Sequence, residues 1–379
     1  MIPVAKPYLT QDEAQSAYDV VLSGWVTQGP KVEELEKKFA EYVGVPYAVA
    51  LSNCTTALHL AMIVAGIKEG DEVICPSMSY IATANAIRYV NAKPVFADVD
   101  PFTYNISVDH TRRLVTSKTK AILIVHQIGM PADIDAFRIL CNEQGLILIE
   151  DAACAVGSTY KGKKIGCHSD LVCFSFHPRK VISTGEGGMI TTSNKNYAER
   201  LRLLRQHGMA INDRVRHSSN KILISDHIEL GYNYRMTDIQ AAIGIKQLEK
   251  LDWIVDQRRK IADYYRARLK DVSCLRLPLE PQKCRSNFQS YCVYVNQEYP
   301  RPVVDLMQDL LDAGVSTRSG IMLTHKETAY KELYSQTSLP VSEDLLQRCL
   351  LLPLYVPMSK DDVDKVINEL LKAVTTSVR

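Results

Sequence analysis

The sequence lacks the features that mark a membrane-spanning, secreted or metal-binding protein. None of its ten cysteines belongs to a C-x-x-C pair, the spacing of many zinc sites and redox dithiols. No apolar run approaches the roughly 20 residues that a membrane helix needs, and the segment MIPVAKPYLTQDEAQ has no signal-peptide core. We therefore expect a cytoplasmic protein with reduced cysteines, no metal site and no membrane partner.

An excess of charge of one sign is also lacking. Lys and Arg number 45 against 43 Asp and Glu, so the formal net charge is only +2. Nucleic-acid-binding surfaces are usually basic, and nucleic acid is therefore not an expected partner.

The chain of 379 residues exceeds the size at which one hydrophobic core keeps growing, and its 46% hydrophobic content is typical of a folded protein. Two domains are expected.

The order of apolar runs predicts the fold class. Between residues 30 and 195, short apolar runs alternate with segments of helical periodicity, which indicates a mostly parallel sheet covered on both faces. A long helical pattern follows, with a cap at Thr237 or Asp238. Later segments predict a smaller α+β unit. We place a large α/β domain at 1–250 and a small C-terminal domain at 251–379.

Residues that follow the strands are candidates for a ligand site, because ligands bind beyond the carboxyl ends of strands in open α/β sheets. In ALSNCTTALHLA, Thr55 and Thr56 begin a helix, where N–H groups and hydroxyls can hold a phosphate or merely cap the helix. Tyr80 follows the apolar run of DEVIC and could lie against a flat ring or pack in the core. The sequence alone leaves both alternatives open.

Two charged positions extend this set. The apolar run in LILIEDAACAVGS ends in Glu150 and Asp151, and a carboxylate buried there needs a cation such as a pyridinium nitrogen, unless it forms a structural ion pair or caps a helix. Lys180 lies in FSFHPRKVISTGEGG; near apolar groups a lysine can lose its charge and form a Schiff base, although most lysines are surface charges. Together these groups match the requirements of pyridoxal 5'-phosphate (PLP).

Five stretches, found in the same order along the chain, carry a family resemblance. They are GWVTQGPKVEELEKKFAEYVG, SNCTTALHLA, IEDAACAVGS, FSFHPRKVISTGEGGMI and ELGYNYRMTDIQAAIG. Over nearly its whole length the sequence resembles the DegT/DnrJ/EryC1/StrS family of sugar aminotransferases, which are fold type I enzymes that use PLP. The resemblance implies an α/β fold type I transferase, with a mostly parallel central sheet and a smaller C-terminal α+β domain.

The resemblance also implies roles for single residues of the cofactor site. Lys180 corresponds to the lysine that forms the Schiff base, Asp151 to the pyridinium-binding aspartate and Tyr80 to the aromatic residue that stacks on the ring. The positions that match the family's phosphate contacts are Thr55, Thr56 and Ser175. The catalytic residues are therefore expected to be Lys180 and Asp151.

Three further positions concern the dimer and the departures from the family. Asn233 matches the asparagine that reaches the neighbouring subunit's phosphate, so a homodimer with shared active sites is implied. Cys154 stands where the family usually has Gln or His, near the ring hydroxyl or the lysine. Cys54 stands where the phosphate turn usually has Gly, so the backbone there could differ.

The implied reaction is transfer of an amino group from glutamate to a nucleotide-linked keto-sugar, such as a 4-keto-6-deoxy hexose. The product would be a deoxyamino sugar for a surface polysaccharide or a natural product. Loop residues that resemble the family's substrate contacts are Arg216, His217, Arg318 and His325. His126 and His177 follow strands and either touch the site or have structural roles.

Two alternative functions stay open at this point. The chain could be a regulatory protein that binds PLP without turnover, or a PLP-dependent sugar dehydratase. Family dehydratases carry histidine at the position of the lysine, so the presence of Lys180 favours aminotransfer. The presence of Lys180, Asp151 and Tyr80 together argues against a site that has lost its activity.

Overall fold

The computed structural model describes residues 1–210, 222 and 226–376. The predicted substrate contacts Arg216 and His217 lie outside the described residues. Within the described ranges, no helix combines the length and the apolar character that crossing a membrane requires.

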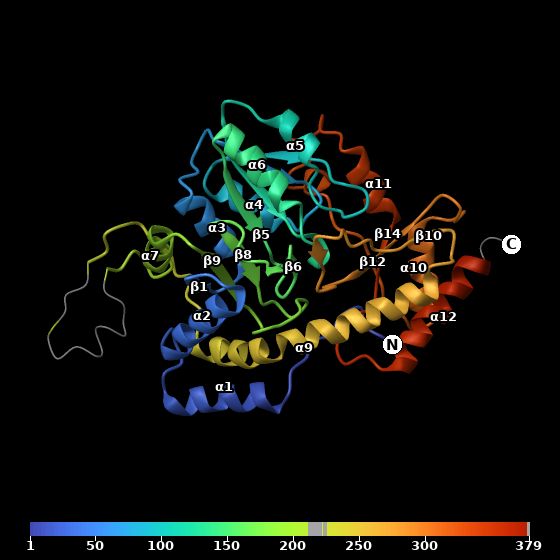
Figure 1. The fold of residues 1–379 in the computed structure, drawn as a ribbon, viewed down its shortest axis with the longest axis horizontal. Coiled ribbons are helices and arrows are strands. Elements are labelled where there is room, and N and C mark those ends of the chain that lie inside the picture. Colours follow the sequence, from blue (N-terminus) through green and yellow to red (C-terminus); the bar gives the residue numbers. More distant parts are fainter. Residues whose placement is uncertain (211–221, 223–225, 377–379) are drawn as a thin grey trace.

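A seven-stranded sheet forms the centre of the molecule (Figure 1). Its strands, in spatial order, are β1 (Tyr47–Leu51), β9 (Gly188–Thr192), β8 (Val172–Ser175), β5 (Ile147–Asp151), β4 (Thr119–Val125), β2 (Glu72–Pro76) and β3 (Lys93–Ala97). The pairs from β8 to β3 are parallel, and β9 runs antiparallel to both of its neighbours. The predicted α/β class with a mostly parallel central sheet is confirmed.

Helices cover both faces of this sheet, which explains its continuous apolar strands. One core contains side chains of α3 (Cys54–Val64), α4 (Ala82–Tyr89) and α7 (Lys195–Leu204). The core on the other face contains side chains of α2 (Pro30–Val43), α6 (Ile134–Gln144) and the first part of α9, and α5 (Val108–Leu114) packs at its edge. In β4, Ile122 and Ile124 belong to the second core and Leu123 to the first, as the alternation of side chains along a strand requires.

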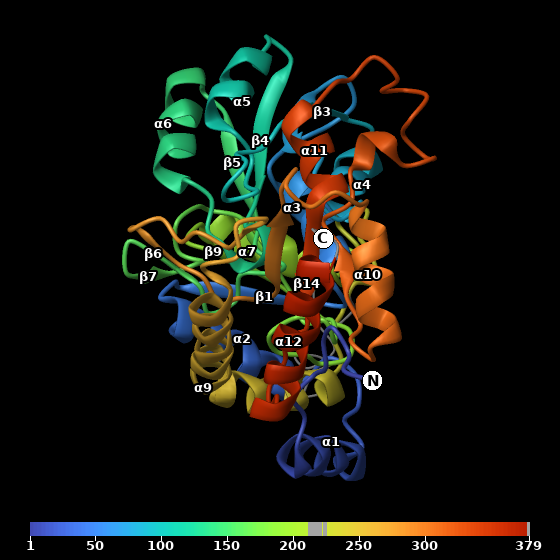
Figure 2. The same ribbon diagram turned by 90° about the vertical axis from the view of Figure 1, so that its right-hand side faces the viewer.

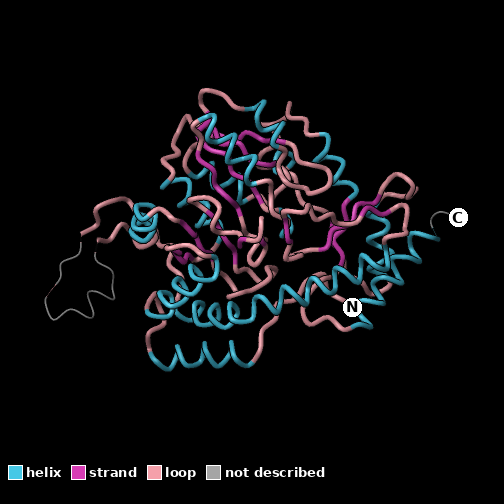
Figure 3. The backbone as a smooth tube through the Cα atoms, viewed as in Figure 1, coloured by secondary structure: helices cyan, strands magenta, loops and turns pink. Residues whose placement is uncertain are grey.

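A second sheet is antiparallel and has four strands, in the order β10 (Leu275–Arg276), β12 (Tyr291–Val295), β14 (Cys349–Leu352) and β13 (Arg318–Ser319). Helices α10 (Val303–Asp312) and α12 (Lys360–Thr376) pack with it around a separate core, and α11 (Pro340–Arg348) lies at its edge (Figure 2). The shorter elements are β6 (Thr159–Tyr160), β7 (Lys163–Lys164), β11 (Cys284–Arg285), η1 (Gln127–Gly129) and η2 (Thr324–Lys326). Figure 3 shows the strands in magenta, with the helices around them in cyan and the connecting loops in pink.

Helix α9 (Asp238–Leu269) runs beneath both sheets and, with α1 (Gln11–Ser23) below it, forms the lower side of the molecule in Figure 1. Its start agrees with the predicted cap, since the Thr237 side chain accepts a hydrogen bond from the backbone N–H of Gln240. Its first half packs on α1 and α2, and its last turns enter the core of the small sheet. The division into 1–250 and 251–379 stays a prediction, and residue 250 falls inside this helix.

Two buried carboxylates attach the N-terminal segment to α9. Asp238 accepts hydrogen bonds from the backbone N–H groups of Gly29, Lys31 and Val32, at 2.8 to 3.0 Å, and so satisfies donors at the start of α2. Glu13 of α1 lies 2.9 Å from the ammonium of Lys250. The N-terminal segment is thereby fixed below the large sheet.

Candidate active site

A cavity of about 840 Å³ lies beyond the carboxyl ends of the large sheet's parallel strands. Among the predicted residues, those that line it are Thr55, Thr56, Tyr80, Asp151, Ser175 and Lys180. They come from four separate segments of the chain. The topology therefore brings together residues that the sequence separates by more than a hundred positions, as expected for the ends of parallel strands.

The first turn of α3 forms one end of the cavity. Asn53 is the N-cap: its side chain accepts a hydrogen bond from the N–H of Thr56 at 2.9 Å, and the Thr56 hydroxyl donates to the Asn53 carbonyl at 2.8 Å. Both Thr55 and Thr56 nevertheless line the cavity, so capping and ligand contact are compatible here. The positive end of the helix dipole and its N–H groups suit an anion such as phosphate.

The backbone of this turn is conventional although Cys54 stands in it. Cys54 is the first residue of α3 and is not among the residues with positive φ. The residue that must be glycine is Gly188 at the start of β9, because a Cβ there would overlap the backbone of Asn53. Gly188 thus allows β9 to pack directly against the first turn of α3.

Asp151 ends β5 and is 5% exposed. Its carboxylate accepts a hydrogen bond from the Thr83 hydroxyl at 2.9 Å and another from the N–H of Ala153 at 3.1 Å. Burial raises the pKa of Asp151, and these two bonds oppose that rise only in part. Both donors are neutral, so a cationic ligand group beside Asp151 would stabilise its charged form.

Glu150, the neighbouring carboxylate, has a different environment. It receives a hydrogen bond from Ser169, and its Oε2 lies 2.7 Å from Nε2 of the buried His126. Because His126 Nδ1 accepts the N–H of Ala132 at 3.0 Å, Nε2 carries the hydrogen that is donated to Glu150. His126 therefore has a structural role in this fold and does not line the cavity.

Lys180 lies in the connection between β8 and β9, where its backbone N–H donates to the carbonyl of His177 at 2.8 Å. Its Nζ donates to Cys154 Sγ at 3.3 Å. Burial acts to lower the pKa of Lys180, but the charges of Cys154, Cys54 and Asp151 outweigh it, so the pKa is raised above its usual value. Burial therefore favours the neutral amine, as the sequence suggested, but in the cofactor-free protein the neighbouring groups outweigh it.

The wall between these groups carries further predicted side chains. Ser175 ends β8 and is buried, with its hydroxyl 3.4 Å from the N–H of His177. His177 also lines the cavity, and burial lowers its pKa. Tyr80 is 70% exposed and lines the cavity too, so its ring is available to a ligand and is not part of the core.

Asn233 is not among the residues that line the cavity of its own chain. The segment that carries it lies against the turn that precedes α3, because Ser52 N–H donates to the carbonyl of Tyr234 at 2.8 Å. Tyr234 lines the cavity and stacks on Tyr232, with ring centroids 4.9 Å apart. Asn233 itself is exposed, and its side-chain oxygen accepts a hydrogen bond from Arg235 at 3.2 Å.

Two predicted substrate contacts lie beyond the cavity wall. His325 is 2% exposed, with Nδ1 2.6 Å from the Ser77 hydroxyl and Nε2 3.4 Å from Glu343, so neither nitrogen is open to a substrate in this structure. Arg318 is exposed on β13. Partial burial and the positive charge of Arg179, which lines the cavity, lower the pKa of Arg318.

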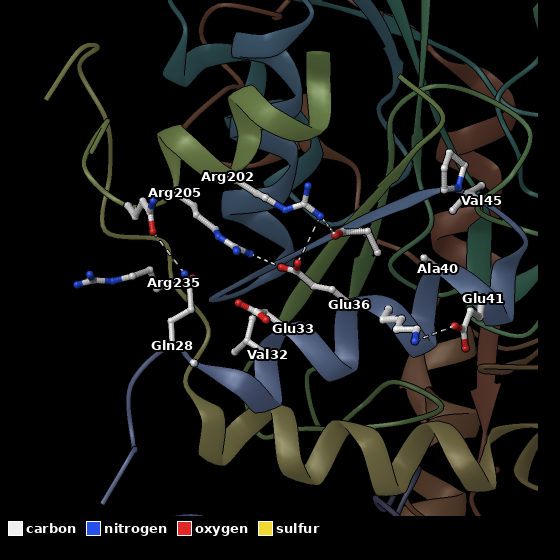
Figure 4. Close-up of a pocket in the computed structure, with 15 residues that line it drawn as sticks. Gln28, Val32, Glu33, Glu36, Ala40, Glu41, Val45, Arg202, Arg205 and Arg235 are labelled. Atoms are coloured by element: carbon white, nitrogen blue, oxygen red, sulfur yellow. Dashed lines mark hydrogen bonds and ion pairs between the residues drawn. The ribbon is translucent and has the colours of Figure 1, made fainter. Parts of the chain in front are cut away.

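A second cavity, of about 480 Å³, lies between α2, β1 and α7 (Figure 4). Its charged side chains neutralise one another: Glu36 binds the buried Arg205 and lies 3.5 Å from Arg202. Lys37 lies 4.0 Å from Glu41 at the other end. The predicted cofactor residues, apart from Cys154 and Asn233, line the larger cavity instead.

The larger cavity fits PLP on the chemistry of its lining. It offers an amine for the carbonyl, a buried carboxylate without a charged donor for the pyridinium nitrogen, and a helix N-terminus for the phosphate. Lining residues that sequence reasoning missed are His59, Thr83, Tyr89 and Glu186. Thr83 and Tyr89 belong to the helical pattern after Tyr80, which carries no signature of a ligand contact.

Comparisons with known proteins agree with this geometry. The model of the DegT/DnrJ/EryC1/StrS aminotransferase family matches residues 7–371. The uncharacterized protein MJ1066 of Methanocaldococcus jannaschii is 36% identical over 99% of this chain and 98% of its own. The aminotransferase TlmJ of Streptoalloteichus hindustanus matches with a TM-score of 0.91 and 35% identity over 99% of both chains. Helicobacter pylori PseC, an aminotransferase involved in pseudoaminic acid biosynthesis, matches with a TM-score of 0.92 and 26% identity over 99% of both chains.

Proposed function

The chain belongs to the DegT/DnrJ/EryC1/StrS aminotransferase family, whose members depend on PLP, and on this premise we propose that it aminates a nucleotide-linked keto-sugar. Glutamate is the proposed amino donor, and a 4-keto-6-deoxy hexose is the proposed acceptor. The observation that carries the proposal is that Lys180 and Asp151 line one cavity with the N-terminus of α3. The product would be a deoxyamino sugar for a surface polysaccharide or a natural product.

PLP supplies, when bound, a ring that accepts the electrons released at the substrate carbon. The protein has to place a base beside that carbon, and Lys180 is the proposed base. Its Nζ lies near Asp151, Cys154 and Cys54, and this environment raises the pKa of the free amine despite burial. Once the amine is free during turnover, it can remove a proton from the substrate carbon. It can then deliver that proton to a second carbon of the reacting system.

Asp151 is the proposed partner of the cofactor's ring nitrogen. Its burial makes an isolated negative charge costly, and a protonated ring nitrogen would relieve that cost by a charge-assisted hydrogen bond. Thr83 and the N–H of Ala153 fix the two carboxylate oxygens, which orients the group toward the cavity. Cys154 would lie beside Lys180 in this arrangement, and Tyr80 would cover the ring.

The remaining roles divide between two subunits. Thr55, Thr56 and Ser175 would hold the phosphate from the same chain. Asn233 would reach the phosphate of the partner subunit; that it is exposed and does not line the cavity of its own chain supports this role. Arg318 is the proposed contact to the nucleotide's phosphates, since its charge lies close to that of Arg179 on the cavity wall.

The proposal is tested with PLP-loaded protein and glutamate, by measuring 2-oxoglutarate and the absorbance of the bound cofactor. A panel of nucleotide-linked amino sugars then runs the half-reaction in reverse and identifies the sugar. Conversion of the cofactor by glutamate and by one such amino sugar supports the proposal. An unresponsive cofactor would favour a regulatory PLP-binding protein, and release of water from the sugar without amino transfer would favour a dehydratase.

A further inference from the structure

Ser77, the residue directly after β2, is bound to the segment that follows the edge strand of the small sheet. Its carbonyl accepts the backbone N–H of Thr324 at 2.9 Å, and its hydroxyl accepts the backbone N–H of His325 at 3.1 Å. The same hydroxyl lies 2.6 Å from Nδ1 of the His325 ring. Three hydrogen bonds therefore join one serine at the end of a large-sheet strand to two residues of η2.

The directions of the bonds to the His325 ring follow from its partners. The carboxylate of Glu343 can only accept, so Nε2, 3.4 Å from it, carries the hydrogen. Burial lowers the pKa of His325 and so favours the neutral ring, in which Nδ1 is then the acceptor. The Ser77 hydroxyl therefore gives its only hydrogen to Nδ1. Because His325 is 2% exposed and Ser77 is fully buried, water does not compete for this bond.

A second set of hydrogen bonds leads from Ser77 to Asp151. The backbone N–H of Ser79 donates to the carbonyl of Ser77 at 2.9 Å. The Ser79 hydroxyl lies 2.7 Å from that of Thr83, whose only hydrogen goes to Asp151, so Ser79 is the donor. Ser79 and Thr83 are also buried. A continuous series of buried hydrogen bonds thus runs from His325 to Asp151.

We propose that His325 is a positioning residue for Asp151, although it is not among the residues that line the cavity. It fixes Ser77, which fixes the backbone of Ser79. Ser79 in turn supplies the hydrogen bond that leaves the Thr83 hydrogen for Asp151. The carboxylate is thereby oriented from the small-sheet side of the molecule. The inference rests on the proposed function for the identity of the ligand at Asp151, but not for the geometry of the series.

Another contact between the two parts of the molecule provides a matched control. The Tyr334 hydroxyl, in the segment between η2 and α11, donates to the carbonyl of Pro94 in β3 at 2.6 Å. Like the His325 contact, it joins this segment to a strand of the large sheet. It is not a member of the series that reaches Asp151. Tyr334→Phe therefore removes a comparable contact and leaves the series intact.

The first test measures PLP affinity by equilibrium dialysis for two substitutions of similar size at His325. His325→Asn keeps a polar atom near the position of Nδ1, whereas His325→Leu removes it and leaves similar space. We expect His325→Leu to bind PLP about two- to tenfold more weakly than the native protein, and His325→Asn to recover most of this loss. Tyr334→Phe should bind PLP as the native protein does. Equal losses in the two His325 variants, or no loss in either, would overturn the proposal.

The second test asks whether the effect of His325 passes through Thr83. In a Thr83→Val background the link to Asp151 is already broken, so adding His325→Leu should change PLP affinity by less than about twofold. Ser77→Ala is a milder break in the same series and should behave in the same way in both backgrounds, which keeps the test available if His325→Leu does not fold. Losses that multiply in the double variants would show that His325 acts independently of Thr83 and would overturn the proposal.

A third measurement does not depend on the cofactor. Crystal structures of cofactor-free His325→Leu and Ser77→Ala should show the Thr83–Asp151 contact lengthened beyond hydrogen-bond distance, whereas Tyr334→Phe should retain it. An intact contact in both of the first two variants would contradict the positioning role. Failure of the native protein to take up PLP would instead refute the proposed function, and the structures would still test the geometry.

Discussion

The hydroxyl of Thr83, in the first turn of α4, donates a hydrogen bond to the carboxylate of Asp151 at the end of β5, with an oxygen–oxygen distance of 2.9 Å. The Thr83 hydroxyl also lies 2.7 Å from that of Ser79. Since Thr83 has one hydrogen and gives it to Asp151, Ser79 must be the donor in the second contact. Two hydroxyls in series thus orient the carboxylate and help to keep it charged.

Replacing Thr83 with valine should weaken PLP binding and turnover without changing the size of the side chain. A hydrogen bond to a charged group contributes about 1.5–3 kcal/mol, so we expect losses of about tenfold to a hundredfold. Without this donor the pKa of Asp151 rises further, and the acid limb of PLP binding should move to higher pH. Equilibrium dialysis across pH measures this shift, and Thr83→Ser, which keeps the hydroxyl, is the matched control.

Lys180→Ala should abolish turnover and covalent attachment of PLP, because arginine, the other cation in SFHPRKVIS, does not act as a nucleophile. Borohydride reduction followed by peptide mass spectrometry should place the cofactor on Lys180 in the native protein. Lys163→Ala, at an exposed lysine outside the cavity lining, is the control. A modified peptide from another lysine would refute the site assignment.

Asp151→Asn should leave PLP bound and sharply reduce turnover. The amide keeps the shape of the carboxylate but cannot stabilise a protonated ring nitrogen by charge, a loss of about 1.5–3 kcal/mol or more. A cofactor analogue with a fixed positive charge at that nitrogen should restore part of the rate. Full activity of the variant with ordinary PLP would show that Asp151 is not the partner of the ring nitrogen.

Asn233→Ala should lower the affinity for PLP by roughly tenfold or more without unfolding the chain, through loss of one hydrogen bond to a charged group. Mixed with Lys180→Ala protomers, it should form heterodimers in which one of the two sites has both Lys180 and the partner subunit's intact asparagine. Titration of PLP and activity assays should detect recovery beyond either parent. Heterodimers without recovery would exclude a shared site.

Glu13 should make stability depend on pH in acid. Burial opposes its charged form, but hydrogen bonds from Lys250, Gln247 and Thr10 outweigh this effect and lower its pKa to about 2 from an ordinary value of 4.5. The contribution is thus fully present above pH 4.5 and is lost as the pH falls toward 2. Urea midpoints should show Glu13→Gln destabilised by about 1–3 kcal/mol at pH 7, with a smaller difference at pH 3. The exposed Glu41→Gln should change stability by less than about 1 kcal/mol at either pH.

The sequence predicted the central sheet and the start of α9 because these features follow from local patterns. Continuous apolar runs required a sheet covered on both faces. Thr237, followed three residues later by Gln240, has the sequence pattern of a capping box at the start of a helix. The rule that ligands bind at the carboxyl ends of strands brought Asp151, Ser175 and Lys180 to one cavity. Local rules therefore sufficed for the elements and for the place of the site.

The remaining features depend on contacts between distant residues, which local patterns do not encode. Thr83 precedes its partner Asp151 by 68 positions, and nothing around it marks a hydrogen bond. His325 resembles a loop residue in sequence, but Ser77 and Glu343 enclose it in the fold. The pKa of Lys180 likewise depends on groups from other segments, since Cys154 and Asp151 help to outweigh the effect of burial.

The shared helix α9 limits how the chain could be divided into independent pieces. Its Leu251, Ile254 and Val255 are buried in the core of the large sheet, whereas Tyr265 and Leu269 belong to the core of the small sheet. A fragment ending at residue 250 would leave apolar holes in its own core, and the complementary fragment would expose the side chains that fill them. Separately expressed halves would therefore be expected to aggregate or to reassociate, and a viable break in the chain would have to fall outside α9.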